Sequence, residues 1–178
     1  MTGGAPGDAR VLLMGMMGCG KTTVGTALSA RTGWEYLDND ELVHRATGEA
    51  TPDILRDRGE GALRAAESAA LTVALAIPPP VIAAVAGGIV EDATDRERLR
   101  SGGFVVFLRA RISTLADRVG AGEGRPWLQP DPAAALARLY RGREELYRQA
   151  ATLVLDVDEA SPDELAGAIL EGLAAGAR

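Results

Sequence analysis

Residues 15–22 form a glycine-rich run, GMMGCGKT, whose residue types and spacing are suited to holding phosphate groups. The run matches the pattern G-x-x-x-x-G-K-[ST] and carries one further glycine, at position 18. Glycines permit backbone angles that turn several N–H groups inward, and their missing side chains let phosphate oxygens come close. In such a loop the lysine reaches the outer phosphates and the threonine hydroxyl can ligate Mg²⁺. The run therefore predicts a phosphate-binding loop.

Lys21 is the only lysine in a chain that has 18 arginines. A planar guanidinium does not substitute well for a compact ammonium charge between two phosphates, so the chemistry of the loop accounts for this lysine. The same count argues against a GTPase, because an N-K-x-D signature would need a second lysine. Cys19 is expected to contribute its backbone and is not interpreted as a nucleophile. The residues predicted to bind a nucleotide here are Gly15, Gly18, Cys19, Gly20, Lys21, Thr22 and Thr23.

The stretch YLDNDEL, residues 36–42, places two aspartates two positions apart where the second strand is expected to end. In open α/β sheets the ligand binds at the carboxyl ends of the strands. At such a junction one carboxylate can hold water on Mg²⁺ while the other receives a substrate hydroxyl. The alternative is that Asp40 merely caps the helix that follows.

Short apolar runs alternate with longer periodic segments, which predicts a parallel α/β sheet with both faces covered. One domain is expected over residues 10–178, after a disordered leader at residues 1–9. The predicted strands are 10–14, 35–37, 81–86, 104–108 and 153–156. The predicted helices are 21–31, 40–47, 52–58, 61–76, 95–101, 112–119, 132–150 and 162–174.

Helix start and stop signals support several of these elements. Thr51 and Ser161 each precede a proline, which predicts an N-cap side chain followed by proline at the first helical position. Gly33 and Gly102 follow predicted helix ends, where a left-handed residue is often needed.

Composition narrows the class of protein. With 47% hydrophobic and 25% charged residues the chain is globular, and its net charge of −6 argues against general nucleic-acid binding. No apolar run approaches the ~18 residues of a membrane span, and no secretory signal is visible. A single cysteine favours a cytoplasmic location. The only histidine, His44, has no second histidine or cysteine nearby and is expected at the surface.

Taken together, the motifs resemble the shikimate kinase family over residues 10 to 170. The resemblance rests on the loop, on LDND, and on GEGALRAAE, which is similar to the family's G-E-x-x-F-R-x-x-E. It continues with AGG after a strand, RPWL in a glycine-flanked segment, and REELYRQAA before the last strand. It implies a three-layer α/β/α fold with a five-stranded parallel sheet of P-loop kinase type. It also implies a mobile lid at about residues 120–131 and a substrate-binding helical region at about residues 40–70.

The resemblance further implies ATP-dependent phosphorylation of shikimate, with Mg²⁺ and without nucleic-acid or membrane partners, by a chain expected to be monomeric. Lys21 would contact the transferring phosphoryl group. Thr22 and Asp38 would hold the metal, and Asp40 would orient the acceptor hydroxyl and accept its proton. The remaining positions that the resemblance implies are Arg64, Gly87, Gly88 and Arg143 for the acceptor, Arg118 against the adenine, and Arg125 as a catalytic lid residue over the phosphates.

Four positions depart from the family pattern. Leu55 and Leu63 stand where aromatic residues are usual, Ala86 replaces the first of three glycines, and Trp127 replaces a leucine in the lid. Smaller pocket walls would admit a larger or differently substituted ring. The alternatives are therefore a related enzyme acting on another cyclitol or sugar acid, such as a gluconate-type kinase, and a nucleotide-binding homologue without catalysis.

Overall fold

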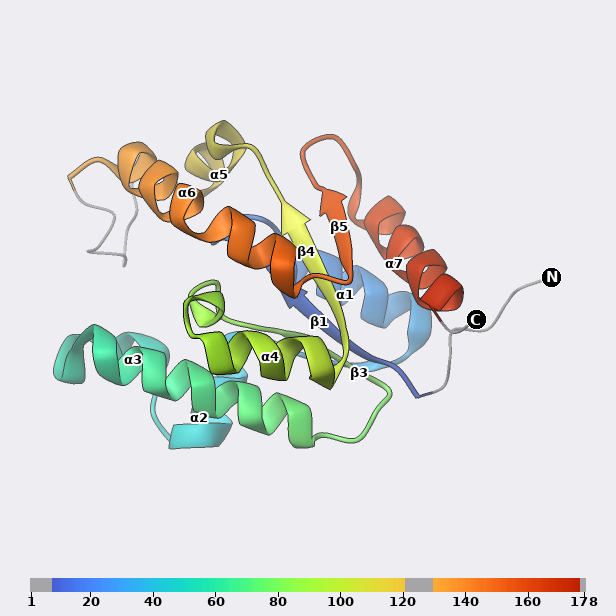
Figure 1. Ribbon diagram of the computed structural model, residues 1–178, viewed down its shortest axis with the longest axis horizontal. Coiled ribbons are helices and arrows are strands. Elements are labelled where there is room, and N and C mark those ends of the chain that lie inside the picture. The colour runs from blue at the N-terminus through green and yellow to red at the C-terminus, as the bar shows by residue number, and fades with distance from the viewer. Residues whose placement is uncertain (1–7, 121–129, 177–178) are drawn as a thin grey trace.

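The computed structural model describes residues 8–120 and 130–176 (Figure 1). One sheet of five parallel strands has the order β2-β3-β1-β4-β5. The predicted α/β class and the predicted five-stranded parallel sheet are both confirmed. The strands are β1 (Arg10–Met14), β2 (Glu35–Leu37), β3 (Val81–Ala84), β4 (Phe104–Arg109) and β5 (Leu153–Asp156).

Helices cover both faces of this sheet, which makes the three layers that were predicted (Figure 1). On one face α1 packs against α7, and on the other α4 and α6 contact each other and β4. α2 and α3 pack together as a pair. The helices are α1 (Lys21–Thr32), α2 (Asn39–Thr47), α3 (Thr51–Ala76), α4 (Ala93–Gly102), α5 (Ile112–Val119), α6 (Pro132–Ala150) and α7 (Pro162–Gly176), with the short 3₁₀ helix η1 (Ile89–Glu91).

The central strands are apolar because helices cover both of their faces. Side chains 11–14 of β1 and 105–108 of β4 are fully buried, the burial expected of a parallel strand inside such a sandwich. β3 is shorter than predicted, because it ends at Ala84 and not at residue 86. The N–H of Val85 still donates to the carbonyl of Leu13 at 3.0 Å. The chain then turns into η1, an element that the sequence pattern did not predict.

Two of the predicted helix caps differ in outcome. Ser161 caps α7 as predicted: its hydroxyl accepts from the N–H of Glu164 at 3.2 Å, and the Glu164 carboxylate accepts from the N–H of Ser161 at 2.8 Å. This reciprocal pair is a capping box. The prediction for Thr51 is wrong, because Ala50 is the N-cap of α3 and Thr51 is already helical. The Thr51 hydroxyl instead donates a hydrogen bond to the carboxylate of Asp40.

The glycines at two helix ends also differ. Gly33 adopts the predicted left-handed conformation, with φ of 74°, and its N–H donates to the carbonyl of Ser29 at 2.8 Å. Gly102 is not left-handed and is the last residue of α4. A Cβ at that position would lie 2.4 Å from Cδ2 of Leu75. Packing of α4 against α3, and not backbone geometry, therefore explains this glycine.

The break predicted between residues 58 and 61 lies at Gly59. Its φ of 81° and ψ of −178° interrupt the helical geometry inside α3. An L side chain rarely adopts such angles, so a glycine is needed to redirect the helix. The two helical stretches on either side of Gly59 correspond to the two predicted helices.

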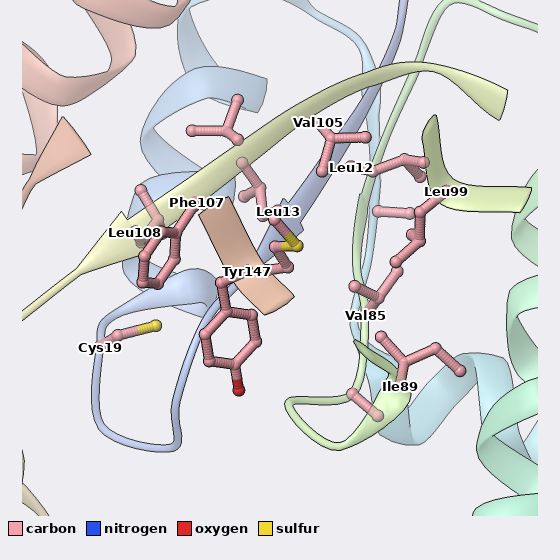
Figure 2. Close-up of a cluster of buried hydrophobic side chains, with 14 of the residues drawn as sticks. Leu12, Leu13, Cys19, Val85, Ile89, Leu99, Val105, Phe107, Leu108 and Tyr147 are labelled. Atoms are coloured by element: carbon pink, nitrogen blue, oxygen red, sulfur yellow. The ribbon is translucent and has the colours of Figure 1, made fainter. Parts of the chain in front are cut away.

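A stacked aromatic pair sits at the centre of the core, below the phosphate loop. The rings of Phe107 in β4 and Tyr147 in α6 are 4.8 Å apart, and neither side chain is exposed. Figure 2 shows the two rings beside Cys19, with the Tyr147 hydroxyl pointing out of the apolar cluster. Among the helices described, none is long and apolar enough to cross a membrane.

Candidate active site

The predicted phosphate-binding loop connects β1 to α1 and follows the carboxyl end of the strand. Gly15, Gly18 and Gly20 have φ values of 147°, 81° and 96°, angles that L side chains rarely adopt. A Cβ on Gly15 would also lie 2.6 Å from the carbonyl oxygen of Leu108. The backbone conformation therefore favours glycine at all three positions, and the close carbonyl of Leu108 requires it at Gly15 as well.

The Lys21 ammonium is held against this loop by the loop's own backbone. Its Nζ donates to the carbonyl oxygens of Gly15 at 2.9 Å and Met16 at 3.3 Å. Lys21 is also the first residue of α1, so the positive end of the helix dipole points at the same space. Two sources of positive potential thus meet at one place, which suits a polyphosphate.

A cavity of about 520 Å³ opens on the outer side of the loop. Residues 18–24 line it together with Arg118 of α5 and Pro162 of α7. The Arg118 guanidinium donates to the carbonyl of Gly18 at 3.2 Å. The predicted nucleotide residues from Gly18 to Thr23 and Arg118 are therefore brought together around one hollow, while Gly15 lies at the start of the loop.

The predicted metal pair, Thr22 and Asp38, is in direct contact. The Thr22 hydroxyl donates to Oδ2 of Asp38 at 3.0 Å. Hydroxyl and carboxylate oxygens are the ligands that Mg²⁺ prefers, and this ion usually takes few protein ligands beside substrate phosphates and water. In the described parts of the chain, no group of three or more acidic, histidine or cysteine side chains is arranged so that it could hold a metal ion by itself. The pair therefore fits a magnesium ion shared with a nucleotide.

Tyr36 is a neighbour of this pair that sequence reasoning missed. Its hydroxyl donates to the same Oδ2 of Asp38 at 3.1 Å. Burial is the main cause that raises the pKa of the Tyr36 phenol, so the group stays protonated and remains a donor. The ring lies over Gly25 of α1, where a Cβ would be 2.2 Å from it. The signal was present in the sequence as a tyrosine two residues before the aspartate.

Asp38, and not Asp40, caps α2. Oδ1 of Asp38 accepts from the N–H of Asp40 at 3.0 Å, and α2 begins at Asn39. The alternative in which Asp40 merely caps the helix is therefore wrong. Asp40 is exposed, and its Oδ1 accepts from the Thr51 hydroxyl at 2.8 Å. Asp40 therefore does not cap the helix, and it lines a second cavity.

This second cavity, of about 700 Å³, joins the phosphate loop to the predicted acceptor residues. Its walls come from the phosphate loop and the start of α1, from residues 38–40 after β2, from α3, from residues 84–88 at the end of β3 and after it, and from α6. Nine of the predicted site residues line it: Gly18, Lys21, Thr22, Asp38, Asp40, Arg64, Gly87, Gly88 and Arg143. Gly18 lines both cavities, as do Lys21 and Thr22, so the two hollows meet at the loop.

The two predicted acceptor arginines are fixed by carboxylates. Nη1 of Arg64 donates to Glu67 at 2.7 Å, and Arg143 donates from Nε and Nη2 to the two oxygens of Glu91, both at 3.1 Å. Only 4% of Arg143 is exposed. Burial raises the pKa of the Glu67 carboxyl, opposed by the charge of Arg64. Sequence reasoning predicted the arginines, included Glu67 in the GEGALRAAE motif without giving it a role, and missed Glu91.

The glycines after β3 make room for these side chains. A Cβ on Gly88 would lie 2.1 Å from Nη1 of Arg64, so a larger residue would displace the guanidinium. The carbonyl of Gly87 accepts from the Tyr147 hydroxyl at 2.6 Å. That contact explains the direction of the Tyr147 hydroxyl in Figure 2 and fixes the loop to α6.

Comparison with known proteins identifies the family. The sequence model of the family described as shikimate kinase matches residues 17–174. This chain belongs to the shikimate kinase family. The match includes most of the phosphate loop and all of the helices that line the two cavities.

Relatives in the family cover nearly the whole chain. The shikimate kinase of Thermobifida fusca is 38% identical over 164 residues, which are 92% of this chain and 94% of that protein. That of Frankia casuarinae is 42% identical over 155 residues, 87% of this chain and 68% of that protein. Among solved structures, the shikimate kinase from Acinetobacter baumannii in complex with shikimate superimposes with a TM-score of 0.87. It is 32% identical, and 94% of each chain is covered.

Three of the four departures from the family pattern lie in the acceptor half of the site. Leu55, Leu63 and Ala86 all line the second cavity. Leu63 and Ala86 are each 6% exposed, so both are part of the wall beneath the cavity surface. The nucleotide half, by contrast, keeps the loop pattern of the shikimate kinase family.

The mobile lid expected at about residues 120–131 stays a prediction, because the structure describes only Gly120, Pro130 and Asp131 of it. Arg125 and Trp127 lie outside the described residues, which resume at Pro130. The predicted leader at residues 1–9 is likewise described only at positions 8 and 9. His44 is exposed, as expected.

Proposed function

We propose that this protein transfers the terminal phosphoryl group of ATP to a hydroxyl of shikimate, giving shikimate 3-phosphate and ADP. The observation that carries the proposal is the continuous cavity from Lys21 and Thr22 to Asp40 and the two acceptor arginines. Its relatives of 38% and 42% identity are named shikimate kinase. A phosphate donor and a carboxylate-bearing acceptor would meet in this one space.

The phosphate loop would hold the nucleotide. Backbone N–H groups of the loop would surround the β- and γ-phosphates, with the Lys21 ammonium as the mobile charge on the transferring group. Arg118 lines the outer cavity and would lie against the adenine. Arg125 would neutralise charge on the phosphates from the lid. Phosphoryl transfer needs little more than such positioning and charge neutralisation.

Thr22 and Asp38 would hold Mg²⁺, Thr22 directly and Asp38 through water. The ion supplies charge neutralisation on the phosphates when it is bound. The Tyr36 hydroxyl and the N–H of Asp40 each bond one oxygen of Asp38, and these contacts fix the direction in which that carboxylate points. The chain's own contribution is thus a carboxylate whose orientation is set before ligands arrive.

Asp40 would act on the acceptor hydroxyl. Its carboxylate accepts the hydroxyl proton as the acceptor oxygen bonds to the γ-phosphorus, and the bond from that phosphorus to the β–γ bridging oxygen breaks, releasing ADP. Arg64 and Arg143 would bind the acceptor carboxylate, because paired guanidinium groups match a planar anion. Gly87 and Gly88 would lie against the ring hydroxyls.

The test is ADP release by the purified protein with Mg-ATP and a panel of acceptors: shikimate, quinate, gluconate and inositols. Turnover that is largest with shikimate, and a product phosphorylated at the 3-hydroxyl, would support the proposal. Nucleotide binding without any phosphorylated shikimate would refute it. Arg64→Ala should raise the shikimate KM, and an unchanged KM would remove that residue from the acceptor site.

A second candidate acceptor is another cyclitol or sugar acid, as in a gluconate-type kinase. Leu55 and Leu63 favour it, because leucines leave a differently shaped wall from the family's aromatic residues. Larger kcat/KM for a bulkier ring acid in the same panel would establish it. A catalytically silent homologue is the third possibility, and equal turnover by wild type and Asp40→Asn would favour that one.

We further propose that the chain works as a monomer in the cytoplasm. ATP is its second substrate, and a single buried cysteine is suited to a reducing compartment. No nucleic-acid or membrane partner is proposed. Sedimentation of the purified protein with and without ligands would test the monomer.

A further inference from the structure

Glu91, the last residue of η1, forms a bidentate ion pair with Arg143, a buried arginine that lines the acceptor cavity. Its two carboxylate oxygens accept from Nε and Nη2 of Arg143, both at 3.1 Å. The two residues are 52 positions apart in sequence, and Arg143 comes from the middle of α6. The sequence motifs that identify the family did not include this glutamate.

A guanidinium group has two edges that a carboxylate can bind. One edge consists of Nε and Nη2, and the other consists of Nη1 and Nη2. Glu91 occupies the first edge of Arg143. The two hydrogen bonds that Arg143 makes with full geometry in the described part of the chain both go to Glu91, from Nε and Nη2, and the Tyr147 hydroxyl is a further polar group close to the guanidinium. The second edge is therefore available to a planar anion in the cavity while the first stays occupied.

Glu91 contacts the acceptor arginines without itself lining the cavity. Arg64 and Arg143 both line the cavity, whereas Glu91 does not appear among the described residues of its wall. Its side chain is 47% exposed, and one oxygen also lies 3.9 Å from Nε of Arg64. The carboxylate thus hydrogen-bonds one acceptor arginine and lies 3.9 Å from Nε of the other.

The backbone around Glu91 is itself well held. The N–H of Glu91 donates to the carbonyl of Gly88 at 3.0 Å. Nη1 of Arg96 donates to the carbonyls of Val90 at 2.6 Å and Glu91 at 3.2 Å. A carboxylate on such an anchored turn can fix a long flexible side chain, because the arginine loses its rotational freedom before the acceptor arrives.

A second carboxylate, that of Glu67, also interacts with the charge of Arg143. Glu67 is 8% exposed and lines the same cavity. Burial raises the pKa of Glu67, and the positive charge of Arg143 opposes part of that rise. A guanidinium released from Glu91 would turn toward Glu67, since a buried arginine with unpaired donors is costly. It would then offer the acceptor the wrong edge.

We infer that Glu91 is a positioning residue that holds Arg143 by its Nε–Nη2 edge and so presents the Nη1 edge to the carboxylate of the acceptor. The inference rests on the proposed function, in which Arg143 binds that carboxylate. On this inference, η1 contributes to acceptor recognition through Glu91, in addition to the contribution of Gly87 and Gly88 just before it. Specificity for an acidic acceptor then depends on a glutamate that never touches it.

Glu91→Ala and Glu91→Gln test the inference, with Glu97→Gln as the matched control. Glu97 is an exposed glutamate on α4 that pairs with Arg100, so its loss changes the net charge equally at a remote place. In Glu91→Ala the shikimate KM should rise about 10- to 100-fold, the range known for removing the partners that orient metal ligands. The ATP KM and kcat should stay near wild type, as should all constants of Glu97→Gln.

The methyl ester of shikimate separates positioning from a general loss of structure. Because the ester lacks the anionic carboxylate, Glu91→Ala should leave its already weak KM unchanged. Glu91→Gln keeps one acceptor oxygen and the shape of the side chain, so its shikimate KM should lie between wild type and Glu91→Ala. This conservative variant also serves if Glu91→Ala fails to fold.

Three outcomes would overturn the inference. An unchanged shikimate KM in both variants would show that Arg143 needs no partner. A lower KM would show that Glu91 competes with the acceptor for the arginine. An equal rise for shikimate and its ester would show a structural role only. A wild-type protein that is inactive on shikimate would refute the proposed function and this inference together, whereas an active wild type with unaffected variants would refute the inference alone.

Discussion

The Lys21 ammonium lies between two carbonyls of its own loop, within reach of the phosphates that the loop would hold. Lys21→Ala should lower kcat by about 10²- to 10³-fold, the usual cost of removing one group that stabilises transition-state charge. Lys21→Arg should not restore it, because the longer planar guanidinium cannot take the same point position. Steady-state ADP release measures both. A Lys21→Arg enzyme with nearly wild-type turnover would contradict this role.

Asp38 is bound to Thr22, Tyr36 and the N–H of Asp40, whereas Asp40 accepts only from the Thr51 hydroxyl among the described residues. We therefore expect a change at Asp40 to affect turnover more than nucleotide binding. Asp40→Asn should lower kcat by about 10²-fold or more, since an amide cannot accept the hydroxyl proton. Affinity for ATP should be largely intact, because Asp40 faces the acceptor cavity and not the outer cavity. Calorimetric titration with an ATP analogue and single-turnover assays separate the two effects. Loss of tight ATP binding in Asp40→Asn would contradict the assignment.

At the scale of elements, Gly103 joins α4 to β4 where two strands come close. A Cβ at Gly103 would lie 2.6 Å from the backbone oxygen of Arg10 in β1, and a backbone atom in a paired strand cannot easily move. Gly103→Ala should therefore lower the free energy of unfolding by about 1–3 kcal/mol. Urea unfolding monitored by circular dichroism gives the value.

Gly142 provides the control for that substitution. It lies within α6, and a Cβ there would meet no atom within 4 Å. Gly142→Ala should raise the free energy of unfolding by up to about 1 kcal/mol, because alanine loses less backbone entropy in a helix. A Gly103→Ala protein as stable as Gly142→Ala would show that β1 and β4 tolerate a wider separation than their register indicates.

The elements that sequence predicted best are those whose signal is local. Four of the five strands are short, mostly apolar runs, and all five were predicted, although β2 consists only of the three residues EYL and β3 proved two residues shorter. The phosphate loop was readable because its glycines satisfy a backbone requirement inside eight residues. Ser161 and Gly33 were readable for the same reason, since a cap depends on its immediate neighbours.

The parts that sequence missed depend on contacts between distant segments. Gly102 was taken for a left-handed cap, but the reason for it lies 27 residues away, at Leu75. Nothing local marks Arg143 as a buried arginine among 18, because its burial and its partner come from η1 and α6 meeting in space. The family resemblance supplied Arg143, and only the structure supplied Glu91.

At the scale of the whole molecule, the sheet brings two ligand cavities to one edge, and they share Gly18, Lys21 and Thr22. Each ligand that binds only the folded chain should stabilise it by mass action. At a concentration 100 times its Kd the gain is about 2.7 kcal/mol, which for a chain of this length corresponds to about 5–10 °C in Tm. Shikimate and Mg-ADP should each raise Tm, measured by differential scanning fluorimetry.

The variant Arg64→Ala tests whether the change in Tm with each ligand comes from its own cavity. Arg64 lines the acceptor cavity alone, so the variant should lose the shift with shikimate and keep the shift with Mg-ADP. Lys21 lines both cavities, so Lys21→Ala should reduce the shift with Mg-ADP most and that with shikimate less. If Arg64→Ala lost both shifts equally, the two hollows would behave as one site, and the division into a nucleotide half and an acceptor half would be wrong.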